Sequence, residues 1–275
     1  MYRFLYLLSI LIASALTLYI KPRLISILRN KDMIVSNYSG KDVTCGGGLI
    51  FIIPCMVAVL PFWKLIGQEN IIAYLVLLLS MTLVGYLDDS LGEDVRKGFK
   101  GHLKALMTGC FSTGILKITF ALIIGFIISR VYYSSILAIV FNTLLFSLSM
   151  NFINLLDLRP GRAIKSFALV TLFVSLSSGL QSMWILLPIY SSLTIYIKDE
   201  MEELCMLGDT GANLLGGILG MYVLKEAYPG IKYTLFILLL ILHIIAEFKS
   251  FSKIIDSIPI LKYMDSFGQL KKERS

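Results

Sequence analysis

An adjacent pair of carboxylates, Asp88 and Asp89, stands at the end of a long apolar stretch. Two neighbouring carboxylates at the end of an apolar stretch repel each other and lose part of their hydration. A divalent cation relieves both costs, because hard cations prefer oxygen ligands. The pair therefore predicts a metal site, and the alternative is a helix that simply ends in polar residues.

A second cluster closes another apolar stretch with Asn151, Asn154 and Asp157, which are spaced by three and so share one face of a helix. Amides in apolar sequence need partners, either on neighbouring helices or in a ligand. Arg159 and Arg162 follow directly, and guanidinium groups suit phosphate oxygens. This pattern favours a phosphate-containing ligand; the alternative is amides that pack between helices beside ordinary cytoplasmic arginines.

The third cluster is Gly208-Asp209-Thr210-Gly211, at the start of a further apolar stretch. Flanking glycines allow the backbone to approach a ligand closely, and the N-terminus of the following helix favours anions. The alternative is that Asp209 only caps that helix. If the apolar stretches cross a membrane, all three clusters share one surface and together predict a metal–diphosphate site that faces the cytosol.

The composition indicates what holds these clusters in place. The 275 residues are 57% hydrophobic and 16% charged, and the mean hydropathy is +0.81. A soluble chain of this length cannot bury so much apolar surface in one core, which excludes a soluble globular enzyme and a disordered tail protein. The four cysteines form no CxxC pair, so a disulfide scaffold is excluded as well.

A membrane-spanning helix needs about 20 mostly apolar residues, and a backbone that faces lipid must satisfy its own hydrogen bonds. Beta-barrel alternation is absent, so we expect an all-α, polytopic transmembrane helical bundle over residues 1–247 and a basic cytoplasmic or interfacial tail over 248–275. The first helix is expected to be retained rather than cleaved as a signal peptide. The nine predicted spans are 2–20, 48–66, 70–87, 110–129, 133–153, 164–180, 182–197, 211–225 and 231–247.

The basic residues predict the orientation. Most of the 25 Lys and Arg residues fall on one side if the N-terminus is outside and the C-terminus is cytoplasmic, so the net charge of +7 fits the positive-inside bias better than nucleic-acid binding. Of the 18 acidic residues, only Glu69 and Glu226 then lie outside. The acidic run is interpreted as a solvated surface and comprises Asp199, Glu200, Glu202 and Glu203.

The order and membrane side of these motifs resemble a known family. Asp-Asp after a third helix, NxxNxxD after a fifth and GDxG before an eighth look like the polyprenyl-phosphate N-acetylhexosamine-1-phosphate transferases (glycosyltransferase family 4). These include the phospho-N-acetylmuramoyl-pentapeptide transferase. The stretch Cys45-Gly46-Gly47-Gly48 is similar to the early glycine-rich motif of that family. The resemblance spans about residues 40–220.

The resemblance implies a Mg²⁺-dependent exchange at the cell membrane. In it, a polyprenyl phosphate attacks the β-phosphorus of a UDP-amino sugar, giving a lipid diphosphosugar and UMP. By the same resemblance, Asp88 and Asp89 bind metal or orient the lipid phosphate, and Lys104 is the lysine of the following loop. The expected site comprises catalytic Asp88, Asp89 and Asp157, metal ligands Asp89 and Asp209, and substrate-binding Asn151, Asn154, Arg159, Arg162 and Lys104.

Departures from the family pattern keep a second hypothesis open. The family's DGxDG is replaced by residues 157–161, which read Asp-Leu-Arg-Pro-Gly, and Ala212 stands where the family has Ser. The histidine motif of the last loop is missing, since His102 and His243 are the only histidines. The alternative is therefore a family-derived protein that binds polyprenyl phosphate or a partner enzyme without turnover. Either hypothesis allows a homodimer.

A secondary transporter is the third hypothesis, because Lys117 lies within the fourth predicted span. We rank it last, since few other ionisable groups lie near the middle of a predicted span. The tail carries apolar residues among lysines and is predicted to lie on the inner leaflet, where it could also close over the site. Those apolar residues are Ile254, Ile255, Ile258, Leu261 and Tyr263.

Overall fold

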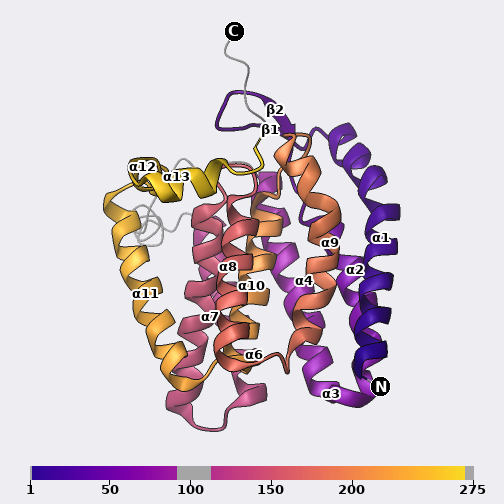
Figure 1. Ribbon diagram of the computed structural model, residues 1–275, viewed down its shortest axis with the longest axis vertical. Helices are drawn as coiled ribbons and strands as arrows, with labels where there is room; N and C mark the ends of the chain where they lie inside the picture. The colour runs from indigo at the N-terminus through magenta and orange to yellow at the C-terminus, as the bar shows by residue number, and fades with distance from the viewer. Residues whose placement is uncertain (1, 92–112, 270–275) are drawn as a thin grey trace.

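The computed structural model describes residues 2–91 and 113–269, and its elements are almost all α-helices (Figure 1). This confirms the predicted all-α class. The helices before the undescribed segment are α1 (Tyr2–Asn30), α2 (Leu49–Val59), the 3-10 turn η1 (Leu60–Phe62), α3 (Trp63–Ile66) and α4 (Gln68–Leu91). Those after it are α6 (Thr113–Tyr132), α7 (Ile136–Leu156), α8 (Arg162–Ser178), α9 (Met183–Met201), α10 (Gly208–Glu226), α11 (Pro229–Phe248), α12 (Phe251–Ser257) and α13 (Pro259–Ser266).

Within residues 2–91 and 113–269, six helical segments are long and apolar enough to cross a membrane. Three further predicted spans coincide with α8, α9 and α10, which are helical but shorter or more polar than those six. The six are Tyr2–Asn30, Leu49–Ile66, Gln68–Leu91, Thr113–Tyr132, Ile136–Leu156 and Pro229–Phe248. The nine-span count and the orientation therefore remain predictions.

Helix α10 is the centre of the bundle, and nearly all of its residues are buried. It packs against α4 on one side and α7 on the other. A Cβ at Gly216 would overlap the backbone of Met150, and one at Gly220 would crowd Phe146. These small residues let the helix axes approach closely, so they serve helix packing.

The first helix is longer than predicted. The apolar pattern indicated 2–20, whereas α1 continues to Asn30. Its additional turns pack beside α9, where Lys21 forms an ion pair with Asp199 and donates a hydrogen bond to the carbonyl oxygen of Ile195. The burial of Leu28 and the contacts of Lys21 stabilise the helix beyond the apolar stretch.

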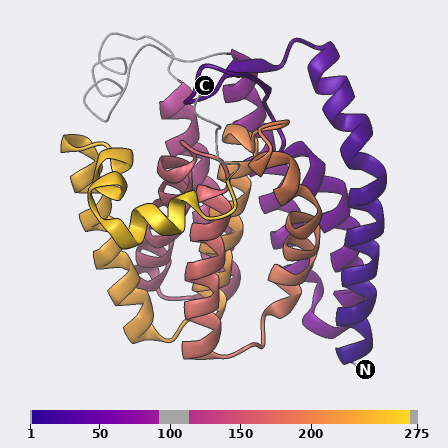
Figure 2. The same cartoon turned by 45° about the horizontal axis from the view of Figure 1, so that its top comes forward.

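One end of the bundle carries the features of interest, and we call it the polar end. The ends of α4 and α7 and the start of α10 lie there, covered in part by the short hairpin of β1 (Ile34–Ser36) and β2 (Asp42–Thr44) (Figure 1). Helices α12 and α13 cross the same end, as the tilted view in Figure 2 shows. The hairpin was not predicted, because its strands have only three residues each.

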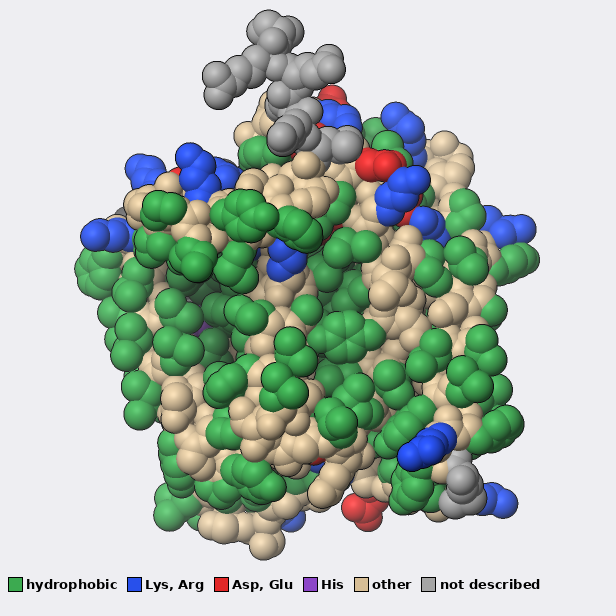
Figure 3. Space-filling view, viewed as in Figure 1, with side chains coloured by type: hydrophobic (Ala, Val, Ile, Leu, Met, Phe, Trp, Pro, Cys, Tyr) green, Lys and Arg blue, Asp and Glu red, His purple; other side chains and the backbone are tan. Residues whose placement is uncertain are grey.

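The surface between the two ends is apolar. In Figure 3, hydrophobic side chains cover the flank, and the Lys, Arg, Asp and Glu side chains gather toward its two ends. Large exposed hydrophobic residues occur along α1, α6, α8 and α11. Such a surface is suited to lipid and not to water, which agrees with a membrane protein.

Candidate functional site

Helix α10 begins against a carboxylate from another helix. Asp89, near the end of α4, accepts hydrogen bonds from the backbone N–H groups of Asp209 and Thr210, each at 2.9 Å, and from the Thr210 hydroxyl. The thiol of Cys45 donates to the same carboxylate at 3.4 Å. The first N–H groups of a helix lack partners within it and favour a negative charge. Asp89, and not Asp209, therefore caps α10.

Two glycines permit this close approach. A Cβ at Gly85 would overlap the carbonyl oxygen of Asp209, and a Cβ at Gly48 would overlap the backbone of Gly211. The start of α10 thus lies directly against the backbones of α4 and the segment entering α2. The early glycine stretch and the GDxG motif are in contact, although more than 150 residues separate them in the chain.

Asp88 and Asp209 share one cation. The ammonium group of Lys117, in the first turns of α6, forms an ion pair with Asp88 and lies 2.8 Å from Oδ1 of Asp209. The side chains of Lys117 and Asp88 are 15% and 11% exposed, so water screens this pair weakly. The sequence indicated Lys117 only as a transporter candidate. A lysine in an apolar stretch does need an acidic partner, and that signal could have linked it to the acids.

A second pair of acids lies at the same end. Asp157 directly follows α7, and Glu200 lies in the last turn of α9, where its Oε1 accepts the backbone N–H of Gly161 at 2.8 Å. Glu200 is only 3% exposed, and its buried Oε2 has no hydrogen-bond partner among the described residues. The prediction of a solvated acidic run is therefore wrong for Glu200. The hydrophilic sequence around Glu200 gives no indication of burial, because the burial of this side chain results from tertiary packing.

Burial sets the electrostatics of this pair. It raises the pKa of Glu200 to about 7. The pKa of Asp157 is also raised, first by burial and then by the negative charges of Glu200, Asp209 and Asp89. Asp157 is thus close enough to the α10 cluster for the charges to interact. Both acids line a small pocket together with Tyr38 and Arg159.

The two asparagines are placed differently. Nδ2 of Asn154 donates to Oδ1 of Asn213 at 3.3 Å, which links α7 to α10. Asn213 is fully buried, and within the part of the chain that the structure describes its own Nδ2 has no hydrogen-bond partner. Asn151 lies one turn earlier in α7 and is partly buried. The Asn154 contact agrees with the helix-packing alternative for these amides.

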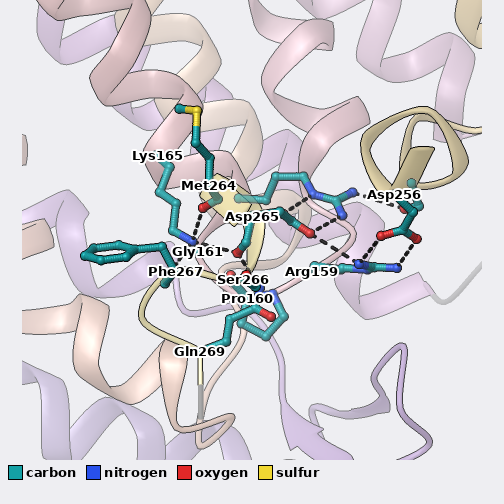
Figure 4. A network of polar contacts seen from close by, with 12 residues as sticks. Arg159, Pro160, Gly161, Lys165, Asp256, Met264, Asp265, Ser266, Phe267 and Gln269 are labelled. Carbon is teal, nitrogen blue, oxygen red and sulfur yellow. Dashed lines mark hydrogen bonds and ion pairs between the residues drawn. The ribbon is translucent and has the colours of Figure 1, made fainter. Parts of the chain in front are cut away.

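The two arginines bind the C-terminal residues 251–269, which we call the strap (Figure 4). Arg162 is 4% exposed and forms two hydrogen bonds, of 2.7 and 2.8 Å, with the equally buried Asp265. Arg159 binds Asp256 through bonds of 2.9 and 2.7 Å and reaches Asp265 at 3.3 Å. In this arrangement the strap, and not a phosphate, occupies the guanidinium donors of both predicted substrate-binding arginines.

The strap has further anchors. Nζ of Lys165 donates to three backbone carbonyl oxygens of the strap, and Gln269 donates to the carbonyl oxygen of Pro160 at 3.2 Å (Figure 4). Burial alone would raise the pKa of Asp265, but the hydrogen bonds and charge of Arg162 outweigh it and hold that pKa below its usual value. The strap therefore carries a buried, ionised carboxylate at the polar end.

Three of the expected site residues thus gather around the start of α10, namely Asp88, Asp89 and Asp209. Asp157 lies at the same end beside Glu200, while Arg159 and Arg162 are held by the strap. Lys104 and His102 lie outside the described residues.

The donor set does not fit the expected Mg²⁺. Both oxygens of Asp89 accept hydrogen bonds from the start of α10, and the ammonium group of Lys117 stands between Asp88 and Asp209. Within residues 2–91 and 113–269, no group of three or more His, Cys, Asp or Glu side chains is arranged to hold a metal ion. Mg²⁺ requires a near-complete shell of oxygen ligands, and these acids are already engaged.

No protein-family model matches this sequence, and no curated protein is significantly similar to it.

Proposed function

We propose that the polar end is the site of a glycosyl-1-phosphate transferase. It would move a sugar-1-phosphate from a UDP-amino sugar to a polyprenyl phosphate and release UMP. The observation that supports this is the convergence of Asp88, Asp89 and Asp209, which come from two distant segments and meet at the polar end. We further propose nine membrane spans, an outside N-terminus and a site that faces the cytosol.

The apolar flank would hold the polyprenyl chain, and the polar end would receive its phosphate. An oxygen of that phosphate attacks the β-phosphorus of the donor, the bond from this phosphorus to the bridging oxygen breaks, and UMP leaves with that oxygen. The attacking phosphate must be deprotonated to act as a nucleophile. Asp157 lines the pocket with a raised pKa and would accept that proton. Because the acids do not fit Mg²⁺, no step of this proposal passes through a metal.

The test measures UMP release from UDP-N-acetylhexosamines with undecaprenyl phosphate, with the protein in lipid nanodiscs. Parallel reactions contain Mg²⁺ or EDTA. We expect Asp157→Asn to lower the rate by about 100-fold or more, the size typical for loss of a general base. Glu69→Gln, which changes an acid in the first turn of α4 at the opposite end, is the matched control and should keep the wild-type rate. Equal rates in wild type and Asp157→Asn would overturn the proposal.

A second candidate is binding without turnover. One observation favours it. Lys117 pairs with two of the acids, and the strap binds both arginines, so the groups that a transferase would use to bind its substrates already have partners within the chain. Under this hypothesis the protein binds undecaprenyl phosphate in nanodiscs but releases no UMP from any donor. Lipid binding with UMP release would exclude it.

A further inference from the structure

The ammonium group of Lys117 lies between two carboxylates at the start of α10. Asp88 comes from the last turn of α4 and Asp209 from the first turn of α10, and the Lys117 ammonium contacts both carboxylates. Asp89, the neighbour of Asp88 in the sequence, is engaged as the cap of α10 through both of its oxygens. The cluster is therefore already organised around a cation that belongs to the chain.

Electrostatics explains why this lysine must be there. Asp88 and Asp209, whose side chains are 11% and 31% exposed, repel each other when both are ionised, because partly buried charges are screened less than charges in water. Lys117 belongs to the apolar helix α6. Its side chain has a flexible four-carbon stem, which allows the ammonium group to reach the polar end. Leaving it unpaired in α6 would be equally costly. The lysine charge and the two carboxylate charges therefore compensate one another.

We propose that Lys117 is the resident cation of this site and holds Asp88 and Asp209 together in place of a divalent metal. The expected consequence is that wild-type protein binds no metal ion through these carboxylates. Removing the lysine charge should free both acids and create a metal site where none existed. This inference concerns binding alone and does not depend on the proposed transfer reaction.

The experiment titrates purified full-length protein in nanodiscs with Mn²⁺ and follows bound Mn²⁺ by electron paramagnetic resonance. We expect no saturable binding by wild type and one bound ion per chain in Lys117→Met. Adding Asp209→Asn to Lys117→Met should abolish that binding. Lys117→Arg keeps the charge and should behave like wild type.

Lys21→Met is the matched control. Lys21 also pairs with a carboxylate near the polar end, Asp199, but it does not bridge two acids, so its removal should create no Mn²⁺ site. If Lys117→Met is destabilised, a rise in its melting temperature on addition of Mn²⁺ gives the same answer.

Two results would overturn the proposal. One is saturable Mn²⁺ binding by wild type that Asp209→Asn abolishes, since a metal would then displace Lys117. The other is a folded Lys117→Met protein that binds no Mn²⁺. Should Lys117→Met fail to fold with or without Mn²⁺, the comparison of wild type with Asp209→Asn decides by itself. Failure of the proposed transferase reaction changes none of these outcomes.

Discussion

At the scale of single residues, the polar end depends on charged groups that are buried and partnered. The carboxyl group of Glu200 is buried with only part of its hydrogen bonding satisfied. One oxygen accepts a hydrogen bond, and the other has no partner in residues 2–91 and 113–269. An ionised carboxylate is penalised there, so the neutral form is favoured up to about pH 7, the pKa that burial gives this group. The stability of the fold should therefore respond to pH through this residue.

The direction of that response follows from proton linkage. The folded pKa of Glu200 is about 7, above its ordinary value of 4.5, so folded protein binds the extra proton between these two pH values. Its contribution to stability is complete at low pH and is lost as the pH rises through this range. We expect Glu200→Gln, which stays neutral, to flatten the decline in melting temperature between about pH 4.5 and 7.

The control for this measurement is Glu202→Gln. Glu202 lies two residues away, is 36% exposed and faces Lys198 at 3.8 Å, so its change should leave the pH profile as it is in wild type. A Glu200→Gln profile that overlays the wild-type profile would contradict the assigned effect of burial.

At the scale of elements, the strap ties the C-terminus to the segment that connects α7 and α8. Arg162 and Asp265 are both buried and bind each other through two hydrogen bonds, whereas Asp256 is an exposed partner of Arg159. Removing one member of a buried pair leaves the other charge uncompensated, which costs far more than losing a pair at the surface. Of these two ion pairs, Arg162–Asp265 therefore contributes more to holding the strap than Arg159–Asp256.

Asp265→Asn should release the strap. The expected loss is about 3–5 kcal/mol of docking free energy, the usual cost of an unpaired buried charge. Limited proteolysis would show it as faster cleavage near residue 250, while Asp256→Asn should be cleaved at nearly the wild-type rate. Because the pKa of Asp265 is lowered, its contribution is present above the ordinary Asp pKa and is lost as the pH falls through the folded pKa. Identical cleavage of Asp265→Asn and wild type would contradict this account.

At the scale of the whole molecule, an apolar flank separates two ends that carry the charges (Figure 3). The proposed orientation places the polar end in the cytosol. Leu180, between α8 and α9, is 60% exposed at the opposite end, and Leu204, between α9 and α10, is 51% exposed at the polar end. Labelling at these two sites can therefore distinguish the two faces.

The described native cysteines Cys45, Cys55 and Cys205 are buried, so they should react slowly with a membrane-impermeant maleimide. In a background that lacks Cys110, we expect Leu180→Cys to be labelled in intact cells and Leu204→Cys only after permeabilisation. The reverse pattern would show the opposite orientation, and labelling of both sites in intact cells would exclude an odd number of spans between them.

The sequence by itself determined the helical class, the approximate position of each long helix and the shared end of the three acidic clusters. Long apolar stretches make helices the favoured structure in lipid, and short connections reverse the chain direction each time. Asp89 and Asp209 are consequently expected at one end from the order of the helices alone.

Only the tertiary structure decided which side chains meet there. Asp89 rather than Asp209 caps α10, Glu200 turns inward, and Lys117 stands between two acids. These pairings depend on how each helix is rotated about its axis and on how closely its neighbours approach. That geometry is set by packing across the whole bundle, because side chains distant in the sequence compete for the same few partners.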